Sequence, residues 1–181
     1  SRRDPDLSTR LTKNIRIDKP FISSNMDTIT EFEMALGMAQ LGGVGIIHRF
    51  MPVADQAQQV AKLKAAEVAN IAASIGVNSD FKERTKALVR NSTNIITIDI
   101  AHGHSVAMIE TMKWLKDTYP DVEIIAGNVA TPQGVEDLIA AGATAIKVGI
   151  GPGSMCTTRI ITGCGVPQLT AVAICSEVAR S

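Results

Sequence analysis

The sequence has few cysteines, no net charge and no long apolar run. Its three cysteines, Cys156, Cys164 and Cys175, are an odd number and form no C-x-x-C pair, so they indicate neither a disulfide framework nor a zinc site. This cysteine usage favours a reducing, cytoplasmic setting. Lys and Arg (18) balance Asp and Glu (18), and no basic or acidic tract predicts a nucleic acid or a membrane as partner. No segment approaches the roughly 18 apolar residues that cross a bilayer, and the N-terminus lacks the apolar core of a signal peptide.

The residues that are present have an ordinary globular composition and a repeating pattern. Hydrophobic residues make up 45% and charged residues 20%, which is enough for a sizeable core. Apolar strand candidates alternate with amphipathic helices, the pattern of βαβ units on a parallel sheet in an α/β fold. The expected strands are 20–26, 44–48, 71–77, 95–101, 123–129 and 145–150; the expected helices are 30–41, one that begins near 52, then 80–90, 105–119, 131–141 and 167–180. The first nineteen residues are expected to be an irregular lead-in.

Three helix starts carry capping signals. Thr30-Glu31-Phe32-Glu33 matches the S/T-x-x-E capping box, which predicts that the Thr30 side chain caps the first helix. Ser79 or Asp80 is expected to cap the third helix, and Thr131 the fifth, with Pro132 in the first turn of the fifth.

Two closures suit six such units: an open doubly wound sheet or part of a (β/α)8 barrel. The pattern alone does not choose between them. In both, ligands bind at the carboxyl ends of the strands, where the distinctive blocks of this sequence fall: 24–28, 48–49, 99–105, 128 and 151–158. This convergence predicts one composite site.

The most distinctive block is the stretch from Lys147 to Arg159, K-V-G-I-G-P-G-S-M-C-T-T-R. An apolar strand runs into a glycine-rich loop, whose backbone can approach a ligand closely. Cys156 lies on that loop, where amide groups can lower the pKa of a thiol, and the thiolate is the reactive form. Cys156 is therefore the candidate nucleophile, whereas Cys164 and Cys175 are expected to be structural.

The run from 149 to 159 resembles the active-site cysteine loop of the IMP dehydrogenase/GMP reductase family. Four more blocks resemble that family in the same order: N-M-D-T at 25–28, D-I-A-H-G-H-S at 99–105, A-G-N-V at 126–129 and G-V-P-Q-L at 165–169. The resemblance implies a (β/α)8 TIM barrel, of which residues 1–181 supply about six βα units as a single catalytic-barrel domain. Because an unclosed barrel leaves sheet edges open, we expect the chain to be part of a longer polypeptide and to be inactive alone.

The resemblance also implies roles for individual residues. Cys156 would attack C2 of the purine ring to form a covalent thioimidate, and Thr158 would assist departure or activation of the 2-amino group. Ser24 and Met26 would contact the base and ribose of a purine nucleotide monophosphate, and Ser154 its phosphate. Without the resemblance, Thr158 is equally well explained as a turn hydroxyl and Met26 as a core residue.

A nicotinamide cofactor and a monovalent cation are implied in the same way. The cofactor-binding set is Asp99, Ala101, Asn128, Gly149 and Gly151. The cation, potassium in many members of the family, would be held by the backbone carbonyls of Gly151, Gly153 and Cys156. For Asp99 the alternative is a strand-end carboxylate that caps local amides. The resemblance further implies a homotetramer.

Three functions are compatible with these residues. The first expectation is a GMP reductase, which converts GMP to IMP with NADPH in purine salvage, because no CBS modules interrupt residues 60–71 and because Asn25, the block 32–35 and the opening Ser1-Arg2-Arg3 look more like reductases. The alternative is an IMP dehydrogenase without its CBS modules, which oxidises IMP to XMP with NAD. Residues 6–12, 43–48 and 158–160 resemble bacterial dehydrogenases and favour it. The third is a non-catalytic half-barrel that binds a nucleotide, against which the intact Cys156 and Thr158 argue.

Overall fold

The computed structural model describes residues 4–180. The Ser1-Arg2-Arg3 motif lies outside the described residues. Six strands form one sheet in the order β3-β4-β5-β6-β7-β8, and the pairs β3–β4, β4–β5 and β7–β8 are parallel. The strands are β3 (Ile22–Ser23), β4 (Val44–Ile47), β5 (Ala72–Ile75), β6 (Ile95–Asp99), β7 (Glu123–Val129) and β8 (Ala145–Val148).

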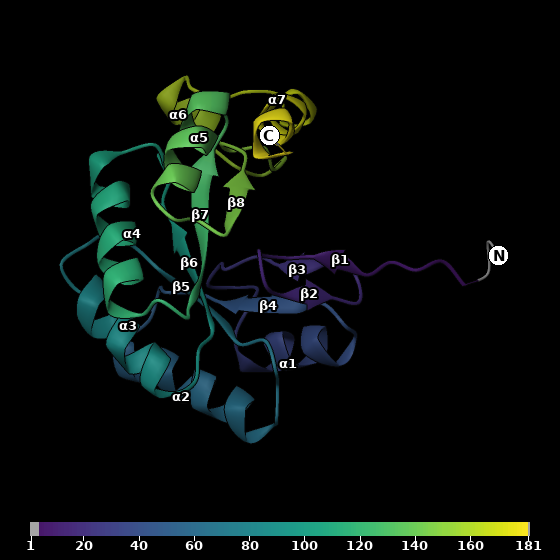
Figure 1. The fold of residues 1–181 in the computed structure, drawn as a ribbon, viewed down its shortest axis with the longest axis vertical. Coiled ribbons are helices and arrows are strands. Elements are labelled where there is room, and N and C mark those ends of the chain that lie inside the picture. Colours follow the sequence, from purple (N-terminus) through teal and green to yellow (C-terminus); the bar gives the residue numbers. More distant parts are fainter. Residues whose placement is uncertain (1–3, 181) are drawn as a thin grey trace. The chain divides into compact units, whose positions relative to one another are not determined.

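Helices connect successive strands of this sheet, as the colours of Figure 1 show along the chain. They are α1 (Phe32–Gln40), α2 (Val53–Ala65), α3 (Phe81–Arg90), α4 (Val106–Thr118) and α5 (Pro132–Ala140), and β8 is followed by the short α6 (Thr158–Thr162) and by α7 (Gln168–Arg180). A doubly wound sheet reverses its strand order at a switch point, whereas strands of a (β/α)8 barrel follow the chain order. The observed order therefore confirms the expected barrel fold, with six of its βα units.

The chain divides into two compact units. The first runs up to residue 97 and includes 121–123, and the second contains 98–120 and the residues from 124 onward. In the first unit β4 and β5 are completely buried. A Cβ atom on Gly45 would lie 2.5 Å from the Cα atom of Ala35, so this glycine allows α1 to pack directly on β4.

The first unit also contains a hairpin that was not expected. Residues 1–19 were predicted to be irregular, but β1 (Thr9–Arg10) pairs with β2 (Arg16–Ile17) in antiparallel fashion. Thr12 and Ile17 are buried, and the Asn14 side chain donates to Glu123 Oε1 at 2.6 Å. The hairpin is therefore held by Thr12, Asn14 and Ile17. Thr12 and Asn14 are polar, so the hydrophobic pattern of the sequence did not indicate their role.

The capping predictions have mixed outcomes. The Thr30 capping box is wrong: Glu31 is the N-cap residue of α1 without a side-chain cap bond, and the Thr30 hydroxyl instead donates to the Ser24 carbonyl at 2.5 Å. The Thr131 cap is confirmed, because Thr131 Oγ1 accepts from the Gly134 N–H at 3.2 Å. Asp80 is the N-cap residue of α3, but its side chain makes no cap bond and instead accepts from Arg84 Nε at 2.9 Å. Ser105 Oγ accepts from the Met108 N–H at 3.3 Å, a cap that was not predicted.

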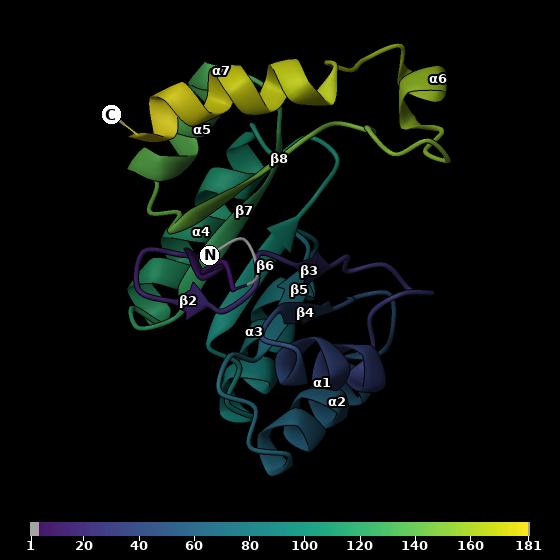
Figure 2. The same cartoon turned by 90° about the vertical axis from the view of Figure 1, so that its right-hand side faces the viewer.

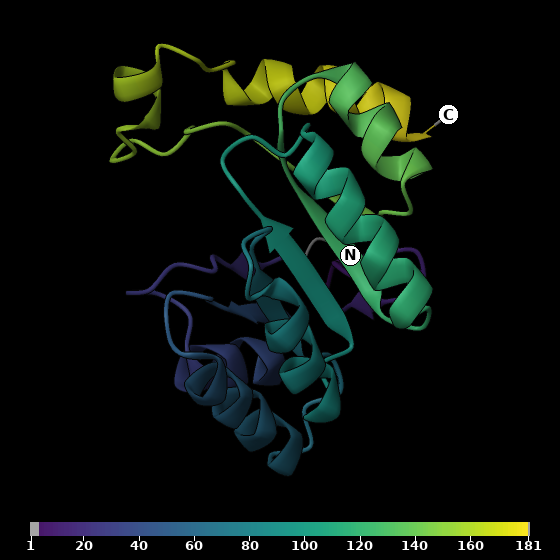
Figure 3. The same cartoon turned by 90° about the vertical axis from the view of Figure 1, so that its left-hand side faces the viewer.

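In the second unit, α5 packs against α7 (Figure 3). The buried side chains of this unit include Met108, Met112, Leu115, Ile124 and Leu138. Strand β8 ends at Val148, two residues earlier than expected, because Gly149 takes φ 131° and leaves the extended conformation. Between residues 4 and 180, no helix combines the length and apolar character that a bilayer crossing requires.

Candidate active site

The cysteine loop, residues 151–157, follows β8 and leads into α6 (Figure 2). Cys156 is exposed, and the neighbouring Met155 is 91% exposed. Within the loop the Cys156 N–H donates to the Gly153 carbonyl at 3.0 Å, which closes a turn and fixes the backbone next to the sulfur. The expected position of Cys156 on the loop that follows this strand is therefore confirmed.

Thr158, the first residue of α6, contacts the thiol. Cys156 Sγ lies 3.3 Å from Thr158 Oγ1. Hydrogen bonds from the Thr158 side chain, then from its backbone, lower the pKa of the Cys156 thiol, and the charge of Arg159 lowers it further. These interactions favour the thiolate, which is the reactive form of a cysteine.

Arg159 forms hydrogen bonds to the backbone on both sides of the segment 151–165. Its Nε donates to the Ile150 carbonyl at 2.9 Å and its Nη2 donates to the Val166 carbonyl at 2.5 Å. Sequence reasoning gave Arg159 no role, although it stands within the distinctive block. The planar guanidinium of Arg159 thus connects Ile150, which precedes the cysteine loop, with Val166.

The ends of β6, β7 and β8 are joined by a second polar group, Lys147. Its Nζ donates to Asp99 Oδ1 at 3.2 Å and to Asn128 Oδ1 at 3.0 Å, and Asn128 Nδ2 donates to the Gly149 carbonyl at 2.7 Å. The structure therefore brings together Asp99, Asn128 and Gly149, three residues of the predicted cofactor set. Lys147 was missed; the signal for it was a charged residue inside an otherwise apolar strand.

A cavity of about 570 Å³ lies in this unit. Its lining includes Ala101, Asn128, Ile150, Thr158 and Cys164. The predicted cofactor contacts Ala101 and Asn128 therefore border the same cavity as Thr158, which touches Cys156. The other predicted cofactor contacts, Asp99, Gly149 and Gly151, are not among its lining residues.

The predicted cation carbonyls belong to the cysteine loop. Gly151 has φ 56°, a conformation that glycine adopts without strain, and the Gly153 carbonyl accepts the Cys156 N–H. Since a carbonyl oxygen has two lone pairs, this bond leaves room for a cation contact. In the described part of the chain, no three His, Cys, Asp or Glu side chains are grouped as a metal site.

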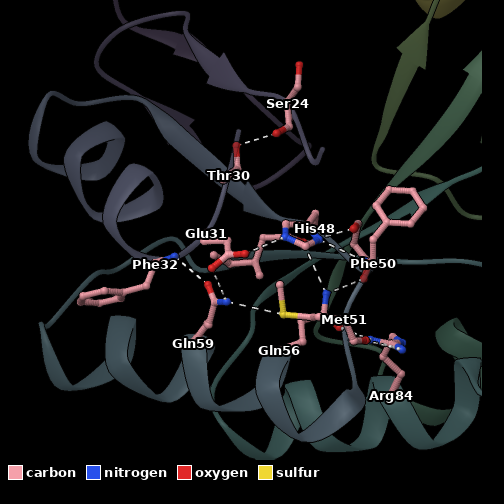
Figure 4. A network of polar contacts seen from close by, with 12 residues as sticks. Ser24, Thr30, Glu31, Phe32, His48, Phe50, Met51, Gln56, Gln59 and Arg84 are labelled. Carbon is pink, nitrogen blue, oxygen red and sulfur yellow. Dashed lines mark hydrogen bonds and ion pairs between the residues drawn. The ribbon is translucent and has the colours of Figure 1, made fainter. Parts of the chain in front are cut away.

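The predicted nucleotide contacts lie in different units and are described separately. Ser24 and Met26 belong to the first unit, after β3, and both are exposed. Met26 is 52% exposed, which excludes its interpretation as a core residue. Figure 4 shows Ser24, whose carbonyl accepts the Thr30 hydroxyl, at one end of a polar network. Ser154 is exposed on the cysteine loop of the second unit.

His48 is the centre of that network (Figure 4). It is 2% exposed; its Nδ1 accepts the Phe50 N–H at 3.1 Å, and its Nε2 lies 3.2 Å from Glu31 Oε1. Because Nδ1 is an acceptor, Nε2 carries the proton of the neutral ring and donates it to the carboxylate. Gln59 binds the other Glu31 oxygen at 3.1 Å and accepts the Phe32 N–H, so His48 connects β4 to α1 as a hydrogen-bonding residue.

The other two cysteines have different surroundings. Cys175 is buried in α7, where desolvation raises the pKa of its thiol, in agreement with a structural role. Cys164 is exposed and borders the cavity. It is therefore not the packed structural residue that was expected.

Comparison with known proteins identifies relatives along the whole chain. A model of the IMP dehydrogenase / GMP reductase domain matches residues 1–181. Inosine-5'-monophosphate dehydrogenase of Nitrosopumilus maritimus is 31% identical over 301 residues, which cover 98% of this chain and 63% of that protein. The enzyme of the same name from Cryptosporidium parvum is 41% identical (98% of this chain, 54% of that protein), and that of Borreliella burgdorferi is 37% identical (92% and 53%). The chain thus spans about half to two thirds of the length of these relatives.

The cysteine loop, the activated thiol and the polar strand ends agree with the family match over all 181 residues. The chain belongs to the IMP dehydrogenase/GMP reductase family, whose members are oxidoreductases that act on purine nucleotides.

Proposed function

We propose that this chain is the cysteine-bearing part of an IMP dehydrogenase, which oxidises IMP to XMP. The observation that carries the proposal is the exposed Cys156 thiol, whose pKa is lowered by Thr158. Its loop follows β8, and at the ends of β6, β7 and β8 the side chains of Asp99, Asn128 and Lys147 are hydrogen-bonded to one another. The choice of IMP as substrate is supported by the relatives, which are named inosine-5'-monophosphate dehydrogenases.

The chemistry follows from the thiolate. Cys156 Sγ adds to C2 of the purine, and the bound nicotinamide dinucleotide (NAD) supplies an acceptor for the hydride that leaves C2. Water then attacks the same carbon of the thioimidate; the C–S bond breaks, XMP leaves and the thiol is restored. A polarisable sulfur suits this sequence because it both adds and departs readily.

The surrounding residues have assigned parts in this proposal. Thr158 stabilises the thiolate by its hydrogen bond. Asp99, Ala101 and Asn128 orient the nicotinamide, and Gly149 and Gly151 allow its close approach. The remaining contacts are Ser24 and Met26 on the base and ribose, Ser154 on the phosphate, and the carbonyls of Gly151, Gly153 and Cys156 on potassium. A homotetramer and a cytoplasmic location belong to the same proposal and rest on the family resemblance.

GMP reductase is the second candidate, because Asn25 and the block 32–35 look more like reductases. In that reaction Cys156 would add to C2 of GMP, ammonia would leave, and NADPH would supply the hydride that gives IMP. Both reactions require C2 and the nicotinamide beside the same sulfur, so the cysteine loop serves either.

Absorbance at the nicotinamide band distinguishes the two reactions. The protein, expressed from its complete reading frame, is mixed with IMP and NAD in one cuvette and with GMP and NADPH in another, both with potassium. A rise in the first is expected. A fall in the second with no change in the first would replace the proposal by GMP reductase, and no change in either would favour a non-catalytic nucleotide-binding barrel.

A further inference from the structure

We infer that Lys147 is a positioning residue that holds Asp99 and Asn128 as one electrically neutral unit beside the nicotinamide, and that this neutrality sets the balance between binding of the oxidised and of the reduced dinucleotide. The inference rests on the proposed function, because it concerns the cofactor side of the same site. Lys147 reaches this place from β8, the strand that leads directly into the cysteine loop.

The geometry of the group is specific. One ammonium bridges the carboxyl ends of β6 and β7, through Asp99 Oδ1 at 3.2 Å and Asn128 Oδ1 at 3.0 Å. Because Asn128 Oδ1 is used by Lys147, its Nδ2 is directed to the Gly149 carbonyl at 2.7 Å. Lys147 therefore fixes which way the Asn128 amide faces, and through Gly149 it connects both side chains to the backbone at the start of the cysteine loop.

The surroundings of the pair make its charge important. The Lys147 side chain is 35% exposed and that of Asp99 24% exposed, so water screens the two charges only in part. Lys147 is half-buried near the end of β8. Its pairing with Asp99 reduces the field that either charge alone would exert on a neighbouring ring.

The two redox forms of nicotinamide respond differently to such a field. The oxidised ring carries a positive charge, whereas the reduced ring is neutral. Without the Lys147 ammonium the Asp99 carboxylate would attract the oxidised ring more strongly, and without that carboxylate the ammonium would repel it, while the reduced ring would be affected little by either change. A role of Lys147 in folding alone would weaken both forms equally.

The test measures dissociation constants of NAD and NADH for the protein with saturating IMP, in a Cys156→Ala background in which no turnover alters the ligand. Lys147→Met should increase the ratio of NADH to NAD dissociation constants by about three- to tenfold, and Asp99→Asn should decrease it by a similar factor. The double variant should return the ratio close to its original value. Lys147→Arg keeps the charge, and Lys113→Met removes an exposed lysine of α4; both should leave the ratio unchanged.

The outcomes separate this inference from the proposed function. A ratio that stays constant in Lys147→Met and in Asp99→Asn, while the background protein binds both dinucleotides, would overturn the inference and leave the proposed function intact. If Lys147→Met does not fold, Asp99→Asn and Lys147→Arg decide the question alone. If the background protein binds neither dinucleotide, the inference and the proposed function are both wrong.

Discussion

The cysteine loop and the strand ends that precede it lie in the same unit but are held in different ways. Residues 152–157 are all exposed, and Cys156 bonds within its own loop to Gly153. At the strand ends, by contrast, Lys147, Asp99 and Asn128 are cross-linked by side-chain hydrogen bonds between three strands. The proposed nucleophile, Cys156, thus lies on a segment with little packing, and the residues proposed to orient the cofactor lie on a packed framework.

This difference suits a reaction in which the sulfur bonds first to the substrate and then releases product. The loop has room to adjust between the two steps, whereas the strand ends keep the groups that orient the second reactant in place. Substitutions in the loop should therefore change reactivity and leave stability intact, and substitutions at the strand ends should change stability.

The largest effect is expected from Cys156→Ala. Without the sulfur no covalent adduct forms, so turnover should fall by at least about 10³-fold. Because the side chain is exposed, the melting temperature should stay within about 1 °C of the original. Activity and thermal melts of the same preparation check this, and substantial remaining turnover would remove Cys156 from the mechanism.

Alanine substitutions at Gly127 in β7 and at Gly153 in the cysteine loop compare how much each region contributes to stability. A Cβ atom at Gly127 would lie 2.6 Å from both Cβ and the carbonyl oxygen of Lys147, so Gly127→Ala should cost about 2 kcal/mol of unfolding free energy. At Gly153 the nearest atom would be Cys156 Cβ at 3.9 Å, so Gly153→Ala should change it by less than about 0.5 kcal/mol. Urea melts measure both, and equal losses would contradict the comparison.

Thr158→Val should make the loop cysteine less reactive without unfolding the protein. Since the Thr158 side chain is the largest cause of the lowered pKa of Cys156, its removal raises that pKa. The thiolate fraction at neutral pH then falls, and the midpoint of the pH dependence of alkylation moves to higher pH. Iodoacetamide rates measured against pH check this, with Thr158→Ser as the control that keeps the hydroxyl and should keep the midpoint.

The smallest effect concerns Cys175, which has no part in the proposed reaction. Burial protects Cys175 and raises the pKa of its thiol, so brief alkylation of the native protein at neutral pH should leave it unmodified while Cys156 reacts. Peptide mass mapping reports both sites in one experiment. Equal modification of the two would show that the environments of the loop and of α7 do not differ in solution.

Much of this arrangement could be predicted from the sequence, because it depends on local patterns. The strand and helix repeat, the Thr131 cap and the loop that carries Cys156 each follow from residues near one another in the chain. The barrel order of the strands could not, since βαβ repeats suit two closures, and only the resemblance chose correctly.

The features that were missed depend on partners distant in sequence. Lys147 looks like an anomaly in an apolar strand until Asp99 and Asn128 are placed beside it. The Thr30 side chain matches a capping box, yet the Ser24 carbonyl competes for it. The hairpin β1–β2 is anchored through Asn14 to Glu123, 109 residues away, a contact that no local pattern encodes.

The most direct test of the central claim is the intact mass of the protein quenched during turnover with IMP and NAD. If Cys156 is the nucleophile, a fraction of the protein should gain the mass of the purine nucleotide, the peptide containing Cys156 should carry it, and Cys156→Ala should show none. Turnover without such an adduct, or an adduct on another residue, would contradict the account.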